Sequence, residues 1–325
     1  PDRPPGHHFM KLGRLISSAL LLCFLTACQK AFPVSADLLP MNFSQPEVKS
    51  GLSSYYNDFS VWSSCISGGS VTIMDGYRVN YDLSGWSYTE GEGTEGQELK
   101  FWNGSADQFR FHAGAPVSAV SQISESSLTL NLSATDKLDG VALYSRPYMV
   151  RRTDPLYGNT VNLRFRYANA RLNLSFTCES DKDLIISDIT LIPASSYATS
   201  GTLRIDYDWN LSEAVSGDLE ISLRSSEPMV FPDVKVPGSS DSSYETSSPW
   251  YVLPDAGVTG RWKVRLVIDG IQHQAEFTID KAWEPGKSYI YKFQYTDKAN
   301  LMFIGTDTEL FVGENLVDGG EHNFS

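Results

Sequence analysis

Cysteine and histidine are both scarce in this chain of 325 residues, which contains four cysteines and five histidines. None of them falls in a CxxC, CxxCH or HExxH spacing, so the sequence predicts no conventional zinc or haem site. A GxSxG nucleophile elbow and a GxxxxGKS/T phosphate loop are missing as well. We therefore expect a protein without catalytic residues, without a metal and without a cofactor.

Basic residues are also few. The chain has 26 Lys and Arg residues against 39 Asp and Glu residues, so its net charge is −13. An acidic chain repels phosphate backbones, which argues against nucleic acid as a partner. The carboxylates form no catalytic pattern. Asp206 and Asp208, for example, share one predicted strand face, where plain solvation is favoured over glycoside hydrolysis or calcium binding.

Long segments of helical periodicity are absent, and short runs of alternating apolar and polar residues take their place. Such runs, separated by turn-forming residues, predict the antiparallel strands of β-sandwiches or barrels. Asp75-Gly76 and Asp269-Gly270 predict hairpin turns, and residues 236–249 predict an exposed loop. The predicted strands are 71–74, 77–81, 99–102, 109–113, 128–132, 161–167, 172–176, 184–186, 189–193, 201–207, 219–223, 262–268, 271–279 and 289–295.

The N-terminus has the organisation of a bacterial lipoprotein signal peptide. Lys11 and Arg14 give a positive start, and the apolar run 15–25 is too short to span a bilayer comfortably. The lipobox Leu25-Thr26-Ala27-Cys28 follows. We expect residues 1–27 to be removed and Cys28 to carry acyl chains such as palmitate, which hold the protein to the outer membrane. An ordinary secretory signal with a chance cysteine is the alternative.

Behind the lipobox, the length of the chain predicts two domains, at residues 58–180 and 181–325. Residues 28–57 show little periodicity and are predicted to be a tether. Two cysteines remain in the exported part, Cys65 and Cys178. They can form a disulfide or stay as two separate buried thiols, and the sequence leaves both open because a bridge needs a specific Cα distance.

Tryptophans near predicted turns are the remaining candidates for binding. Stacking on a sugar ring uses such side chains, although core packing is the expected role for most of them. Trp250, in the loop rich in Ser and Pro, is the best candidate for a ligand contact. The others are Trp62, Trp86, Trp102 and Trp209.

Two segments carry a family resemblance. Residues 161–174, VNLRFRYANARLNL, resemble a hallmark strand pair of the fimbrillin-like proteins of Bacteroidota, which usually have His where this chain has Tyr167. Residues 283–291, WEPGKSYIY, are similar to the second hallmark, and residues 109–116 to a weaker third one. The resemblance implies an all-β fold of two tandem antiparallel β-sandwich domains of transthyretin-like, fimbrillin type. It also implies a pilus (fimbria) subunit, anchor or associated adhesin that acts in cell adhesion.

The resemblance further implies assembly with other fimbrial subunits, in which a strand from one subunit completes a sheet of the next. Polymerising members are released by proteolysis after an Arg near the N-terminus, but no Arg occurs here between Cys28 and Arg78. This departure favours a subunit that keeps its lipid, although Lys30 and Lys49 leave room for another protease. Residues 301–312 are either an exchangeable strand or a terminal strand packed on its own domain.

A carbohydrate-binding surface lipoprotein of a glycan-uptake system is the alternative function, with glycans of a host or bacterial surface as ligands. The sequence does not distinguish the two sides of the outer membrane.

Overall fold

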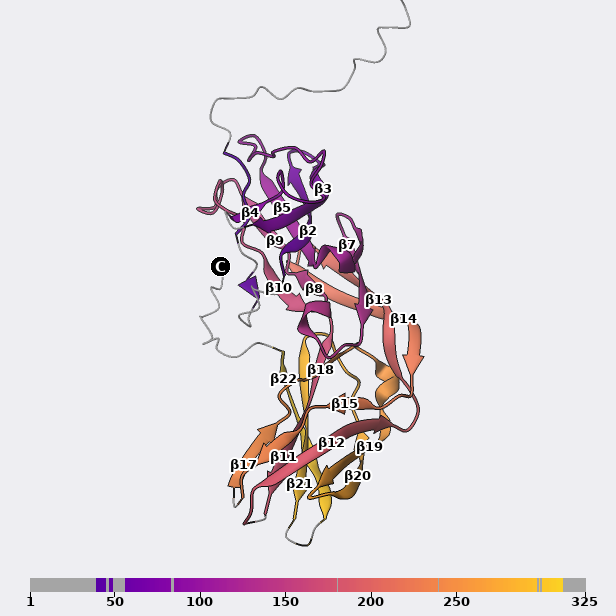
Figure 1. Ribbon diagram of the computed structural model, residues 1–325. Helices are drawn as coiled ribbons and strands as arrows, with labels where there is room; N and C mark the ends of the chain where they lie inside the picture. The colour runs from indigo at the N-terminus through magenta and orange to yellow at the C-terminus, as the bar shows by residue number, and fades with distance from the viewer. Residues whose placement is uncertain are drawn as a thin grey trace, which may run out of the picture. The chain divides into compact units, whose positions relative to one another are not determined.

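Strands make up almost all of the regular structure in the computed structural model (Figure 1). It describes residues 39–44, 47–48, 56–82, 85–179, 181–238, 240–296, 298 and 300–311. Cys28 and the predicted leader lie outside these residues. Within them, the only helical elements are three 3-10 turns of three residues each. The prediction of an all-β fold is confirmed. No helix in this part of the chain is long and apolar enough to cross a membrane.

The strands of the described residues form four sheets. Sheet 1 has the order β1-β10-β8-β5-β2-β3-β4 with β9 beside β5, and sheet 2 has the order β14-β13-β7-β6. Their strands are β1 (Glu47–Val48), β2 (Asp58–Ile66), β3 (Ser70–Asp82), β4 (Gly85–Ser87), β5 (Gln108–Ala115), β6 (Val120–Ile123), β7 (Ser127–Ser133), β8 (Leu143–Ser145), β9 (Tyr148–Arg151), β10 (Arg164–Tyr167), β13 (Tyr197–Asp208) and β14 (Glu213–Ser225).

Sheet 3 has the order β17-β11-β21-β22 with β18 beside β11, and sheet 4 has the order β15-β12-β19-β20 with β16 beside β12. Their strands are β11 (Ala170–Cys178), β12 (Leu184–Pro193), β15 (Met229–Phe231), β16 (Val234–Val236), β17 (Ser240–Glu245), β18 (Trp250–Val252), β19 (Gly260–Ile268), β20 (Ile271–Ile279), β21 (Lys287–Tyr295) and β22 (Leu301–Leu310).

Three hydrophobic clusters hold these sheets together. The first joins sheets 3 and 4 through residues such as Phe176, Leu191 and Phe293. The other two cover opposite faces of sheet 1, because neighbouring residues of a strand point to opposite sides. Val61 belongs to one of these clusters and Trp62 to the other, which also contains the leucines of β7 in sheet 2.

Two Asp-Gly pairs that predicted hairpins have different outcomes. Asp269 and Gly270 both have positive φ, 51° and 78°, and join β19 to β20 in a tight hairpin as predicted. The prediction for Asp75-Gly76 is wrong, because β3 runs on through both residues. Two residues of β3, Asp75 and Gly76, stand opposite one of β2, and Gly76 takes the positive φ of 64° at this bulge.

Residues 236–249 were predicted to be an exposed loop, and this is also wrong in part. β17, at Ser240–Glu245, lies inside this range and pairs with β11, and β18, at Trp250–Val252, follows the range and pairs with the same strand. Ser and Pro in this segment lowered its apparent strand character, whereas its pairing partner lies about seventy residues earlier in the chain and leaves no local signal.

Among the described strands, two pairings are parallel, β1 with β10 and β11 with β21. The second runs over eight residue pairs, from Arg171 opposite Ser288 to Cys178 opposite Tyr295. Sheets 2 and 3 both combine strands from the two sides of residue 180. A boundary at residue 180 would thus run through two sheets. The division into domains 58–180 and 181–325 stays a prediction.

Candidate functional site

The N-terminal segment, defined as residues 39–44, lies against sheet 1 as an added extended piece of chain. It lies inside the predicted tether. Its backbone bonds to residues 100–102 on one side and to Val161 on the other. The four hydrogen bonds run from Met41 N to Lys100 O (2.8 Å), Trp102 N to Leu39 O (2.9 Å), Val161 N to Asn42 O (2.8 Å) and Ser44 N to Val161 O (3.1 Å).

Side chains of the same segment enter the core of sheet 1. Met41 is fully buried and Phe43 is 5% exposed. The Phe43 ring meets Phe59 and Tyr88 edge to face, with centroids 5.7 and 5.8 Å apart. The Tyr88 hydroxyl donates to the carbonyl of Met41 at 3.0 Å. The segment thus fills a strand-wide groove with both ladder bonds and apolar side chains, which is the geometry of strand addition.

The two hallmark segments of the sequence meet in space. β11 and β21 pair in parallel, and the N–H of Gly286 donates to the carbonyl of Asn169 at 3.0 Å. Gly286 has φ of 66°, which allows the tight turn before β21. Trp283 is buried and its indole N–H donates to the hydroxyl of Tyr291 at 3.0 Å. These motifs therefore build the joint between two distant parts of the chain rather than a reactive site.

Phe311, at the end of the described chain, packs on the junction of the same two hallmark segments. Phe311 stacks on Tyr167 with centroids 3.8 Å apart and on Tyr251 at 5.7 Å, and its N–H donates to the carbonyl of Gly286 at 2.7 Å. β22 before it pairs with β21, so this terminal strand is packed on its own sheet. Its exposed side chains include Met302 at 44% and Leu310 at 59%.

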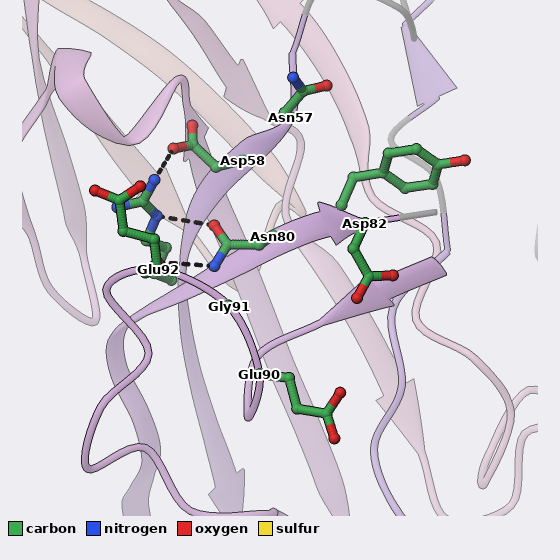
Figure 2. Close-up of a pocket in the computed structure, with 9 residues that line it drawn as sticks. Asn57, Asp58, Asn80, Asp82, Glu90, Gly91 and Glu92 are labelled. Atoms are coloured by element: carbon green, nitrogen blue, oxygen red, sulfur yellow. Dashed lines mark hydrogen bonds and ion pairs between the residues drawn. The ribbon is translucent and has the colours of Figure 1, made fainter. Parts of the chain in front are cut away.

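A polar hollow of about 230 Å³ opens beside β3, and Figure 2 shows its lining. At its centre Arg78 contacts the Asp58 carboxylate at 2.8 Å and donates from Nε to Asn80 Oδ1 at 2.8 Å. Asn80 donates in turn to the carbonyl of Glu92 at 2.9 Å. The Gln97 side-chain amide exchanges two hydrogen bonds with the backbone of Arg78. This network is satisfied within the chain and fixes the loop after β4.

That loop contains the spacing Gly91-x-Gly93-x-x-Gly96, which also occurs in dinucleotide-binding turns. The context differs, because no helix follows and the loop leads to Phe101, which makes only a single β-bridge with Pro40. The predicted strand 99–102 is thus absent. Glutamates also occupy the spaces between the glycines, and their charge repels phosphate. Gly91 and Gly93 instead let Asn80 and Arg78 approach the loop backbone closely. The glycines serve the packing of the loop.

A second hollow, of about 420 Å³, lies at the end of β13. The Arg110 guanidinium lies 5.4 Å from the centre of the Trp209 ring, and the Trp209 indole donates to the carbonyl of Glu125 at 2.8 Å. Trp209 is 9% exposed, so little of its ring is open to a ligand. Within the described part of the chain, no group of three His, Cys, Asp or Glu residues is arranged to hold a metal.

Most of the residues singled out from the sequence have packing roles. Cys28 lies outside the described residues. Cys65 and Cys178 are both buried but belong to different core clusters, and Cys65 is a free thiol. Trp250 is half-buried in β18, packs against the core of sheets 3 and 4, and donates from its indole to the carbonyl of Val230 at 2.8 Å. Trp62 and Trp102 are each 2% exposed.

The fold is that of a β-sandwich protein whose N-terminal segment makes isolated β-bridges to Phe101 and Val161 and packs into the core of sheet 1. The fimbrillin-like family model matches residues 65–309. The chain belongs to this family, and the resemblance found in the two hallmark segments is confirmed. No curated protein matches.

Solved structures support the same fold. A fimbrial protein from Bacteroides vulgatus ATCC 8482 is 12% identical with a TM-score of 0.56, and the match covers 84% of this chain and 99% of that one. A proposed cell adhesion protein from Bacteroides ovatus ATCC 8483 is 11% identical with a TM-score of 0.51, covering 86% and 98%. At these identities the similarity establishes the fold alone.

Proposed function

We propose that this protein is a lipid-anchored member of the fimbrillin-like family that stays on the outer membrane, where it acts in adhesion as an anchor or accessory subunit of a fimbria. Membership of a fimbrial family supports a structural, non-enzymatic role at the cell surface. The observation that carries the proposal is the packed N-terminal segment, which joins the folded part of the chain to the predicted lipid on Cys28.

Release of such a protein needs a cut between its lipid and its folded part. The first Arg after Cys28 is Arg78, in the middle of β3. Its guanidinium is paired with Asp58, and a cut there would break sheet 1 rather than free the N-terminal segment. A protease that cleaves after Arg therefore has no suitable bond, which supports a permanent anchor.

Association with other subunits by strand addition is supported by the groove beside Val161. It accepts both hydrogen bonds and apolar side chains from residues 39–44. A strand from another subunit can use the same groove if the N-terminal segment leaves it. In an anchored protein whose segment stays in place, the groove stays closed.

The mature N-terminus on cells tests this proposal. Mass spectrometry of the membrane fraction should find acylated Cys28 as the first residue. Cys28→Ala should move the protein out of the membrane fraction, whereas Cys23→Ala in the leader should not. A mature chain that begins after Lys30 or Lys49 would show that the anchor is discarded.

The glycan-uptake alternative rests on an accessible tryptophan. Because the Trp250 indole N–H is engaged by Val230 and part of the ring packs on the core, Trp250 offers only a partial stacking face. We therefore favour the fimbrial role.

A further inference from the structure

Two surfaces of opposite charge lie toward opposite edges of sheet 1. The arginine patch consists of Arg146, Arg164 and Arg166, on and next to β8 and β10. The acidic loop consists of residues 88–98, which follow β4. β5, β2 and β3 separate β8 from β4 in the sheet order, so the two surfaces are several strand spacings of about 4.8 Å apart.

The arginine patch is created by strand register. Phe165 stands opposite Ser145, and the N–H of Arg146 donates to the carbonyl of Arg164 at 2.8 Å. Arg146 and Arg164 are therefore cross-strand neighbours, and Arg166 shares the face of Arg164 because side chains alternate with period two. All three are exposed. Like charges placed directly opposite destabilise a sheet, so this arrangement has a cost in the isolated chain.

The counter-charge for this patch is incomplete. Arg164 has an interaction of its own, and Glu47 of β1 stands opposite it. Partial burial, and then the nearby guanidiniums of Arg166 and Arg164, lower the pKa of Arg146. The Tyr144 hydroxyl raises this pKa, and among the residues that the structure describes neither Arg146 nor Arg166 is paired with a carboxylate. Arg146 and Arg166 thus carry excess positive charge on a chain whose net charge is −13.

The acidic loop offers the complementary charge in a fixed shape. Glu90, Glu92 and Glu95 are exposed, whereas Glu98 is paired with Lys100 at 3.3 Å. The loop backbone is held by Asn80 and Gln97, as Figure 2 shows for Asn80 and Glu92. A loop that is already ordered loses little conformational entropy when it binds, so its carboxylates are ready for an interface.

We propose that the acidic loop of one copy docks on the arginine patch of a second copy. The two surfaces lie toward opposite edges of sheet 1, so the contact is taken as heterologous, with the loop of each copy facing the patch of the next. The positions of the two surfaces, toward opposite edges of one sheet, allow this contact to repeat along a row of copies. This inference builds on the proposed role at the cell surface.

The contact is weak in solution, because an exposed ion pair contributes about 0.2–1 kcal/mol and salt screens it. Copies held on one membrane have a high effective concentration, which makes a weak contact sufficient. Carboxylates of the neighbouring copy would also relieve the repulsion between the guanidiniums, and bidentate pairing suits Arg better than Lys.

Sedimentation velocity of the exported Cys28→Ala chain tests the proposal. We expect self-association at about 0.02 M NaCl that is lost at about 0.3 M, where the screening length is shorter. A patch variant, Arg146→Glu with Arg166→Glu, should be monomeric at low salt. A loop variant, Glu90→Lys with Glu92→Lys and Glu95→Lys, should be monomeric as well. Arg152→Glu with Arg204→Glu changes the net charge as much as the patch variant and should still associate.

The decisive variant carries the patch substitutions and the loop substitutions together. Its patch is negative and its loop is positive, so the two surfaces are complementary again and self-association should return. Failure of the combined variant to associate while it remains folded would overturn the proposal, as would association of the patch variant at the parent level. Salt-sensitive binding of a polyuronate through Arg146, without self-association of the parent chain, would also overturn it and assign the patch to an acidic glycan. Failure here leaves the mature N-terminus at Cys28 untouched, so the two tests are separate.

Discussion

His112 shows a titratable residue that is placed for packing. It is fully buried on β5, and its ring stacks on Tyr207 at 4.0 Å and on Trp62 at 5.4 Å between centroids. Nε2 lies 2.7 Å from the carbonyl of Ser124, so this nitrogen carries the proton of the neutral ring. Nδ1 is buried without a partner. A second proton on this ring would have no acceptor.

Acid is therefore expected to destabilise the protein through His112. Burial lowers the pKa of His112 from 6.5 to about 3 in the folded chain. The unfolded chain binds the extra proton first, so stability is complete above the unfolded pKa and falls by up to about 1.4 kcal/mol per pH unit below it. The midpoints of urea unfolding at about pH 7 and about pH 4.5 measure this loss of stability. His112→Gln should reduce the loss. Identical losses in the two proteins would contradict this account.

Residue by residue, the alternation of the sequence predicted many of the buried positions but missed Met41 and Phe43. In β7 the three leucines predicted to share a face are all buried. Met41 and Phe43 alternate over only three residues, which is too short a run for a period to appear. Their burial depends on Phe59 and Tyr88, whose positions the local sequence does not contain.

At the scale of the element, the same dipeptide, Asp-Gly, forms a hairpin turn at one position and a bulge at another. Asp269-Gly270 closes a hairpin because its two flanking runs pair with each other. Asp75-Gly76 becomes a bulge because β3 pairs with β2, which precedes it, on both sides of this dipeptide. Turn chemistry shows where positive φ is tolerated, whereas the partner strand decides whether the chain reverses there. The local sequence pattern does not identify that partner strand.

The turn before β21 should be sensitive to a side chain at Gly286. Its φ of 66° costs an L-residue about 1–2 kcal/mol. A Cβ would also lie 3.4 Å from the carbonyl of Tyr167. Gly286→Ala should lower the free energy of unfolding by roughly this amount in urea titration. Gly69→Ala is the matched control, because φ there is not positive and no atom lies within 4 Å of the added Cβ. Equal effects of the two changes would refute the role given to this turn.

For the whole molecule, the N-terminal segment should behave as a separable strand. A protease site placed between Lys49 and Tyr56 would leave it held by non-covalent contacts alone. A labelled peptide of residues 39–48 should then exchange into the cut protein, which fluorescence anisotropy can follow. Phe43→Ala in the peptide should weaken binding by about a hundredfold or more, since such a truncation in a core costs about 3–5 kcal/mol.

Leu39→Ala in the same peptide is the control, because Leu39 is 55% exposed. A cut protein that never takes up the peptide would mean that the groove is not open to strand addition. Equal binding of the Phe43→Ala and Leu39→Ala peptides would show that the buried ring does not hold the segment.

The parallel pairing of β11 with β21 also constrains the order of events as the newly made chain folds. β11 ends at Cys178 and β21 begins at Lys287, so sheet 3 cannot be completed until more than a hundred further residues have been made. Contacts so distant in the chain form slowly, and until then β11 can pair only on its other side, with β17 and β18. During that interval one edge of an apolar strand stays unpaired, and a chaperone that binds extended apolar segments would find it there.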